Sequence, residues 1–178
     1  MQLVYRRVTN APRGFTLLEL LVVLLIIGVI INFAVLSVGQ HGNAQAREEI
    51  RRLAALIELA GQEAVMTSRE IAVQVSRDGY SFLVLDAEKN ELTAIEDDEL
   101  LRPRTLPEGL SMKIDIEGDT VELGKTSEEE NNARIFLLSS GEIIPPFEVS
   151  VSTKDDDKVY RLTGATNGKL ELVDPDSS

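Results

Sequence analysis

The sequence predicts an α+β protein in which a long amino-terminal helix packs on a domain made of two antiparallel β-sheets. Three observations predict this fold. Residues 15–38 are apolar almost throughout, residues 44–66 carry apolar side chains at a 3.6-residue period, and from residue 71 onward short alternating runs are separated by turn-forming residues. The first two patterns favour one long helix, and the third favours antiparallel strands.

The apolar segment 15–38 is long enough to cross a bilayer. At about 1.5 Å per residue it would form a helix of roughly 36 Å, which exceeds the hydrocarbon core of a membrane, about 30 Å thick. Arg6, Arg7 and Arg13 precede the segment, and no acidic residue does. Because basic residues favour the cytoplasmic side, the sequence predicts a single-pass membrane protein with its carboxyl-terminal domain outside.

Glu19 is the charged residue within this apolar segment. An ionised carboxylate near the centre of a bilayer costs on the order of 2.5 kcal/mol or more, so such a residue marks a candidate functional site. A cation close to the carboxylate offsets part of that cost, because opposite charges attract more strongly in a low dielectric than in water. We therefore expect Glu19 to pair with a positively charged group.

Residues 1–14 are similar to a secretory leader whose cleavage site is in an unusual place. An ordinary signal peptide is cleaved after its apolar region, at small residues. No suitable small-x-small site follows the apolar segment here, and that segment is too long for a typical signal peptide. Cleavage is therefore expected before the helix.

The run GFTLLE, which contains Gly14, Phe15 and Glu19, resembles the processing motif of type IV pilins and type II secretion pseudopilins. The resemblance implies that a prepilin peptidase cuts after Gly14 and methylates the new amino terminus at Phe15. It also implies that Glu19 pairs with the terminal amine of a neighbouring subunit during assembly. The alternative is an ordinary single-pass anchor with an incidental glutamate.

Length and charge limit what the rest of the chain can be. After a leader and a membrane helix, roughly 110 to 140 of the 178 residues remain, enough for one soluble domain. The formal charge of −12 becomes −15 once the three leader arginines are removed, and such a charge repels polyanions. We therefore expect no nucleic-acid partner.

The residues that most enzymes need are scarce. The chain has no cysteine and one histidine, His41, so neither a thiolate metal site nor a histidine-based triad can be built. A phosphate-binding glycine loop is also missing from the sequence. The sequence predicts neither an enzyme, a cofactor nor a metal site. Calcium binding at the acidic stretch 86–99 is the alternative to a solvated loop, although the ligand pattern of a hand-type loop is absent.

The soluble part begins with a helix. Glycines within residues 39–43 predict a bend or a thinning of the helix just outside the membrane. Beyond them the sequence predicts an amphipathic helix that lies on the domain. Its buried stripe is predicted to consist of Ile50, Leu53, Leu56, Ile57, Ala60, Ala64 and Val65.

The remaining chain predicts a series of short strands. The runs 71–75 and 80–85 flank Arg77-Asp78-Gly79, which predicts a β-hairpin. Two prolines make residues 101–110 a stiff extended connector, and the polar run 125–132 is expected to be a surface loop. Further strands are expected at residues 112–116, 121–123, 135–138, 147–151, 159–162 and 169–173.

Pro145 and Pro146 restrict where Ile144 can lie. Proline lacks the backbone N–H that a central strand uses, so a strand ending at this pair belongs at a sheet edge or at a bend. The sequence therefore predicts an edge position for Ile144.

Three later stretches extend the resemblance to the H-type minor pseudopilin of the type II secretion system, with its GspH/FimT-like domain: RPRTLPEG at 102–109, IFLLSSGEIIPPFEVSV at 135–151 and RLTGATNGKLEL at 161–172. The resemblance implies a type IV pilin-like fold and a structural subunit at or near the tip of the periplasmic pseudopilus, which helps to export folded proteins across the outer membrane. The implied partners are the major G-type shaft subunit, the minor I-, J- and K-type subunits, the prepilin peptidase and the inner-membrane assembly platform. The chain lacks the tryptophans that this family often has in its strands.

The resemblance also implies a domain plan. It consists of a leader at 1–14, a membrane and filament-core helix at 15–38, its amphipathic continuation at 39–67, a periplasmic β domain at 68–173 and a frayed tail at 174–178. Two alternatives remain: a FimT-like minor subunit of a type IV pilus, acting in pilus assembly or DNA uptake, and a membrane-tethered periplasmic binding or sensor domain.

Overall fold

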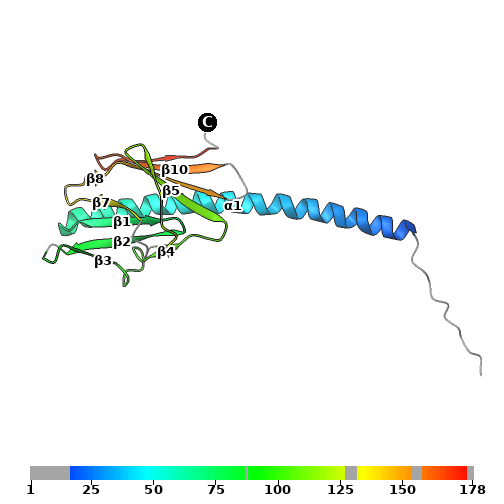
Figure 1. The fold of residues 1–178 in the computed structure, drawn as a ribbon, viewed down its shortest axis with the longest axis horizontal. Helices are drawn as coiled ribbons and strands as arrows, with labels where there is room; N and C mark the ends of the chain where they lie inside the picture. Colours follow the sequence, from blue (N-terminus) through cyan, green and yellow to red (C-terminus); the bar gives the residue numbers. More distant parts are fainter. Residues whose placement is uncertain (1–16, 87, 127–131, 154–157, 176–178) are drawn as a thin grey trace, which may run out of the picture. The chain divides into compact units, whose positions relative to one another are not determined.

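The computed structural model describes residues 17–86, 88–126, 132–153 and 158–175, without the side chains of residues 30–41. It divides into two compact units, Met1–Val38 and Gly39–Ser178. One helix and eleven strands lie in the described part of the chain. The second unit holds all of the strands together with the later turns of the helix (Figure 1).

The helix α1 extends over Leu17–Thr67. Its backbone stays helical through residues 39–43, where the sequence predicted a weakening. Glycine costs about 1 kcal/mol relative to alanine in a helix interior, a penalty that long flanking helical segments can absorb.

The predicted apolar stripe of α1 is confirmed with one exception. Six of its seven residues are buried, each with 7% or less of its surface exposed. Val65 is 48% exposed instead, because it borders a groove at the end of the helix. The buried residues are Ile50, Leu53, Leu56, Ile57, Ala60 and Ala64.

The first sheet has the strand order β3-β2-β1-β7-β8, with β4 also paired to β2. All of its pairings are antiparallel. Its strands are β1 (Ile71–Ser76), β2 (Gly79–Asp86), β3 (Glu91–Ala94), β4 (Arg104–Thr105), β7 (Ala133–Leu137) and β8 (Ile143–Ile144).

The second sheet has the strand order β11-β10-β9-β5-β6 and is antiparallel as well. Its strands are β5 (Leu110–Ile116), β6 (Asp119–Val121), β9 (Phe147–Thr153), β10 (Val159–Gly164) and β11 (Leu170–Val173). One cluster of buried apolar side chains joins α1 to both sheets, so the predicted α+β class with two antiparallel sheets on a helix is confirmed.

The hairpin predicted after α1 is present, with Ser76 paired to Gly79 across the turn. The loop predicted over residues 86–99 is wrong in part, because Glu91–Ala94 forms the edge strand β3 on β2. The connector 101–110 likewise contains the two-residue strand β4. Both strands are short and largely exposed, so they depend on pairing with β2 rather than on an apolar pattern.

The proline pair lies where the chain passes from one sheet to the other. Ile144 ends β8 at an edge of the first sheet, and Phe147 begins β9 in the second. The predicted edge position of Ile144 is therefore confirmed.

Two other predicted segments fall partly outside the described residues. In the loop 125–132, residues 127–131 lie outside them, and in the tail 174–178 so do residues 176–178. The described start of the tail is held in place, because the Asp174 carboxylate pairs with Arg47 on α1.

Candidate functional site

The sequence places the candidate site at the amino-terminal end of α1. Gly14 and Phe15 lie outside the described residues, and α1 begins at Leu17. Glu19 lies in the first turn of the helix and is exposed. Of the three predicted site residues, the structure therefore locates Glu19 alone.

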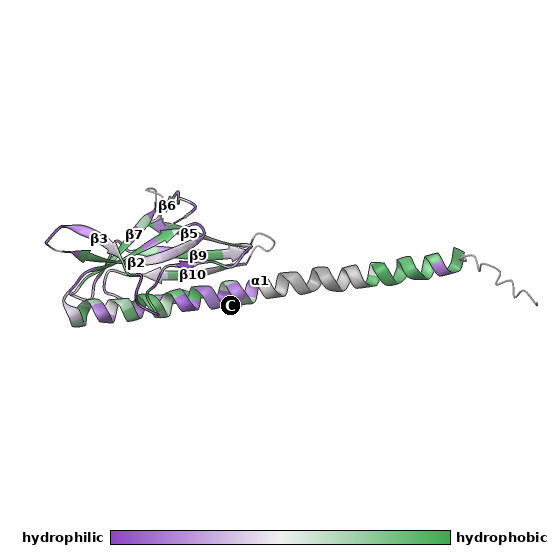
Figure 2. Cartoon of the chain, turned by 90° about the horizontal axis from the view of Figure 1, so that it is seen from below, coloured by the Kyte–Doolittle hydropathy of each residue, from purple (hydrophilic) through white to green (hydrophobic). Residues whose placement is uncertain are grey.

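The helix around Glu19 is apolar on every side. Residues 17–29 contain no other charged residue, and all except Gly28 are exposed. Leu17 and Leu18 expose 82% and 73% of their surfaces, and Leu24 exposes 68%. Because successive helical residues are about 100° apart, the side chains of residues 17–29 point in all directions around the helix. In Figure 2 the ribbon at the described start of α1 is coloured hydrophobic over most of its length. A helix that is apolar all round is stable when other helices or lipid surround it.

The position of Glu19 in the first turn suits a carboxylate. The first backbone N–H groups of a helix lack intrahelical acceptors, and together with the helix dipole they give this end a partial positive charge. That charge stabilises an acidic side chain by about 0.3–1 kcal/mol. The arrangement places one negative charge on an otherwise apolar cylinder, so it favours a cationic group that reaches it through low-dielectric surroundings.

In the described part of the chain, no helix combines the length and the hydropathy that a membrane span requires. Of the predicted membrane segment 15–38, residues 15 and 16 and the side chains of 30–38 lie outside the described residues.

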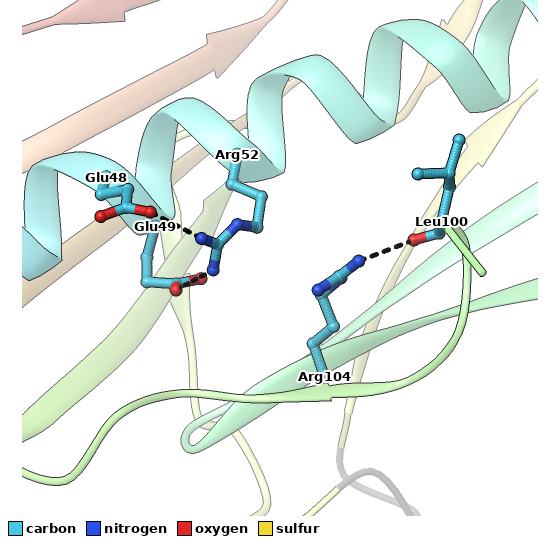
Figure 3. A network of polar contacts seen from close by, with 5 residues as sticks. All are labelled: Glu48, Glu49, Arg52, Leu100 and Arg104. Carbon is cyan, nitrogen blue, oxygen red and sulfur yellow. Dashed lines mark hydrogen bonds and ion pairs between the residues drawn. The ribbon is translucent and has the colours of Figure 1, made fainter.

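A network of polar contacts (Figure 3) includes residues on the later part of α1 and on β4 of the first sheet. Arg52 Nη2 lies 2.7 Å from Glu48 Oε1, and Nη1 of the same guanidinium contacts Glu49 Oε1. The Glu49 side chain is only 9% exposed, so the arginine compensates for a nearly buried charge. Arg104 on β4 reaches the same region and donates a hydrogen bond from Nη2 to the Leu100 carbonyl oxygen at 3.2 Å.

Tyr80 lies beside this network, paired with Arg104 across β2 and β4. The residue is 1% exposed, and its hydroxyl has no hydrogen-bond partner among the described residues. Burial raises the pKa of Tyr80 to about 12, and the negative charge of Glu49 adds to that rise, while Arg104 and Arg52 oppose it. The phenol is therefore neutral at physiological pH.

The residues of this network are not among the site residues that the sequence predicted. Arg52 follows Glu49 by three residues and Glu48 by four, a spacing that brings side chains together on a helix. This spacing is visible in the sequence and could have predicted the helical half of the network. No sequence signal links Tyr80 or Arg104 to that half, because only the fold brings the two parts together.

In the described part of the acidic stretch 86–99, Asp98 organises the turn that follows it. Its Oδ1 accepts hydrogen bonds from the N–H of Leu101 at 2.9 Å and of Leu100 at 2.7 Å. These two bonds hold the pKa of Asp98 below its usual value. Among the described residues, no group of three histidine, cysteine or acidic side chains is arranged to bind a metal.

A helix with an apolar start and one acid in its first turn, followed by two antiparallel sheets packed on its later turns, defines a type IV pilin-like subunit. Comparison with known proteins refines this class. Residues 49–168 match the family described as Type II transport protein GspH, and residues 9–31 match the Prokaryotic N-terminal methylation motif. The chain belongs to the GspH family, the H-type minor pseudopilins of the type II secretion system.

Individual relatives agree with this assignment. The chain is 36% identical to type II secretion system protein H of Pseudomonas aeruginosa over 76% of its own length and 81% of that protein. It is 30% identical to the Vibrio cholerae protein of the same name, over 95% of this chain and 98% of that one.

A solved structure also agrees. The crystal structure of the minor pseudopilin EPSH from the type II secretion system of Vibrio cholerae superimposes with a TM-score of 0.63. The two sequences are 27% identical, and the match covers 76% of this chain and 98% of that one. The chain is therefore a type II minor pseudopilin that works with other pseudopilins. The family is one of structural subunits rather than a known enzyme family.

Proposed function

We propose that the chain is made as an inner-membrane precursor and enters the pseudopilus after its leader has been removed. The prepilin peptidase cuts after Gly14 and methylates the amine of Phe15. The mature helix 15–38 anchors the subunit in the membrane and later lies in the filament core, while the domain 68–173 stays in the periplasm. The match of residues 9–31 to the N-terminal methylation motif supports this proposal.

Glu19 directs assembly in this proposal. Cleavage before Phe15 creates a terminal amine, and a neighbouring subunit's amine pairs with the Glu19 carboxylate. The single observation that carries the proposal is the position of Glu19, a lone acid in the first turn of a helix whose other described side chains from 17 to 29 are uncharged and mostly exposed. Pairing offsets the burial of both charges, so the correctly aligned neighbour is favoured over a misaligned one.

The subunit acts mechanically in this scheme. We place it at or near the tip of the pseudopilus, between the minor I-, J- and K-type subunits and the major G-type shaft, and the inner-membrane platform adds subunits from below. The growing filament moves folded proteins toward the outer membrane. In this scheme the chain itself catalyses no reaction.

Mass spectrometry of the full chain purified from its own membranes tests the proposal. The expected mature protein lacks residues 1–14 and carries one extra methyl group on Phe15. Replacing Gly14 with valine should leave the intact precursor, and a conservative change at Ala11 is the matched control. A mature protein that retains Met1 would contradict the scheme and favour a membrane-tethered binding or sensor domain.

A further inference from the structure

The domain carries an apolar groove at the carboxyl-terminal end of α1, which we call the helix-end groove. It encloses about 400 Å³, within the range of small ligand-binding clefts. One wall is the last turns of α1, with Ile57, Gly61 and Val65, and the opposite wall comes from both sheets, with Leu138 and Leu170. All of these residues belong to the second compact unit.

The wall opposite the helix is preformed. Gly141 and Gly168 come from turns of different sheets, and both have positive φ, 87° and 81°. The turns lie so close together that a side chain at Gly168 would collide with the Gly141 carbonyl oxygen. Ile143 N–H also donates to the Thr166 carbonyl oxygen at 3.1 Å. This wall therefore needs little rearrangement to receive a partner.

Gly61 leaves open space over the helix within the groove. Glycine in a helix interior costs about 1 kcal/mol relative to alanine. A Cβ atom at Gly61 would meet nothing within 4 Å, so packing within the described chain does not require glycine there. The missing side chain instead leaves room over the helix backbone, where a partner side chain can lie.

The chemistry of the rim restricts that partner. Val65 and Met66 carry the apolar lining of the groove to its solvent-exposed edge, with 48% and 83% of their surfaces exposed. The charged residues that line the groove in the described chain are Glu58 and Glu142, and neither lysine nor arginine lines it. An apolar floor with an acidic rim is complementary to an apolar side chain flanked by lysine or arginine.

We propose that the helix-end groove docks an apolar side chain, flanked by lysine or arginine, from a partner protein other than a second copy of this chain. A second copy is disfavoured because the chain is strongly acidic, with a net charge of −12, or −15 without the three leader arginines. Several of its arginines are also engaged: Arg47 and Arg51 with Asp174, Arg52 with Glu48 and Glu49, and Arg161 with Glu148. This docking is separate from the pairing proposed for Glu19.

The test uses the methionines as reporters. The full chain, in lipid nanodiscs and labelled with ¹³C at its methionine methyl groups, is titrated with the peptide Lys-Leu-Phe-Leu-Lys and with its acidic twin Glu-Leu-Phe-Leu-Glu. Met66 lines the groove, whereas Met112 is 1% exposed inside the second sheet and serves as the internal control. We expect the basic peptide to shift the Met66 signal, to leave Met112 unchanged and to bind at least tenfold more tightly than the acidic twin.

Variants separate groove binding from general charge attraction. Gly61→Phe, which fills the groove, and the double change Glu58→Lys with Glu142→Lys should each weaken binding of the basic peptide at least tenfold. The matched control, Glu63→Lys with Glu171→Lys, changes the net charge equally outside the groove and should weaken it less than threefold. An unchanged Met112 signal shows that each variant is folded. Equal binding of both peptides, or equal losses in both double variants, would overturn the proposal.

Cross-linking identifies the natural occupant. A photoreactive benzoylphenylalanine replaces Gln62, a residue of the groove, in the full chain within its own secretion machine, and the control position is Lys113 on β5. We expect a cross-link from position 62 alone, to an apolar residue beside a lysine or arginine of another protein. A cross-link to a second copy of this chain, or to lipid, would refute the assignment. The peptide titration does not depend on Glu19, so the proposed function can fail without affecting that result.

Discussion

Arg47 on α1 and Asp174, the residue after β11, form an ion pair in which Nε lies 2.6 Å from Oδ2. Arg51 Nη2 lies 3.8 Å from the same oxygen. The Asp174 side chain is only 17% exposed, so this contact ties the end of the last strand to the helix. The edge of the second sheet is thereby held against α1 by residues at opposite ends of the domain sequence.

The Arg47–Asp174 pair should contribute measurably to stability. Replacing Asp174 with asparagine is expected to lower the free energy of unfolding by about 1 kcal/mol, near the upper limit for a partly exposed pair because screening by solvent is incomplete at Asp174. Glu148→Gln is the control, since the Arg161–Glu148 pair is exposed on both sides and should be worth less than about 0.5 kcal/mol. Urea denaturation of the full chain in detergent measures both values. Equal losses of unfolding free energy in the two variants would show that the partial burial of Asp174 does not strengthen its ion pair.

Tyr80 should make stability depend on pH in the alkaline range. Its pKa is about 12 in the folded chain against about 10 when unfolded, so the folded state holds the proton more tightly. The associated stability is complete below pH 10 and is lost as the pH rises toward 12, about 2–3 kcal/mol in all. The free energy of unfolding, measured from pH 8 to 12, should therefore fall more steeply for the native chain than for Tyr80→Phe.

The same variant has a second expected outcome near neutral pH. The Tyr80 hydroxyl is buried without a hydrogen-bond partner among the described residues, so its removal should change stability by less than about 1 kcal/mol. Tyr160→Phe on β10 is the comparison, and we expect it to keep the steep alkaline fall because Tyr80 is intact. A loss of several kcal/mol at pH 7 in Tyr80→Phe would reveal a hydrogen bond to that hydroxyl.

The same substitution, glycine to alanine, should have opposite effects at two positions. A Cβ at Gly79 would collide with the Arg104 carbonyl oxygen, so Gly79→Ala must separate β2 from β4 and should cost about 2 kcal/mol or more. Gly61→Ala meets nothing within 4 Å and improves helix propensity, so it should stabilise the chain by about 0.5–1 kcal/mol. Thermal unfolding of the two variants shows whether each substitution stabilises or destabilises the chain. Destabilisation by Gly61→Ala would mean that the helix needs glycine there for its own packing.

Short sequence patterns correctly predicted those elements that are determined by residues close together in the chain. The 3.6-residue stripe on α1 predicted its buried face, and Arg77-Asp78-Gly79 predicted the hairpin of β1 and β2, whose turn is formed by Arg77 and Asp78. Such local patterns do not predict the burial of the polar residues on β1. Gln74 and Ser76 alternate with apolar residues and would be expected to face solvent, yet they are only 5% and 2% exposed.

The reason is the position of β1 at the centre of its sheet. Gln74 is paired with Arg134 on β7, sixty residues away, whose Nε donates to Gln74 Oε1 at 2.8 Å. Ser76 donates to the Gly79 carbonyl oxygen at 3.0 Å. Polar groups that find such partners can be buried without penalty, and no local pattern reveals a partner so far along the chain. The strand β3 was missed for the related reason that pairing with β2, rather than its own apolar residues, makes it a strand.

The functional residues likewise differ in whether the sequence alone reveals them. Glu19 stands out in the sequence because an acid within an apolar segment requires no knowledge of the fold to be noticed. The network of Glu49, Arg52, Tyr80 and Arg104 could not be found in this way, since its two halves come from a helix and from a sheet. The helix-end groove is similar, because its walls are built from three separate segments that meet only in the folded domain.

Replacing Glu19 with glutamine should separate processing from assembly. The change keeps the size of the side chain and removes its charge, so it should leave cleavage after Gly14 intact while removing the attraction to a neighbouring subunit's amine. We expect at least a tenfold loss of the chain from isolated pseudopili, because a tenfold change corresponds to only about 1.4 kcal/mol and a charge pair in apolar surroundings exceeds that amount. Glu63→Gln, an exposed acid on the later part of α1, is the matched control and should be incorporated normally. Normal incorporation of the Glu19 variant would mean that the carboxylate has no role in selecting the neighbour, and the apolar contacts of the helix would then have to align the subunits alone.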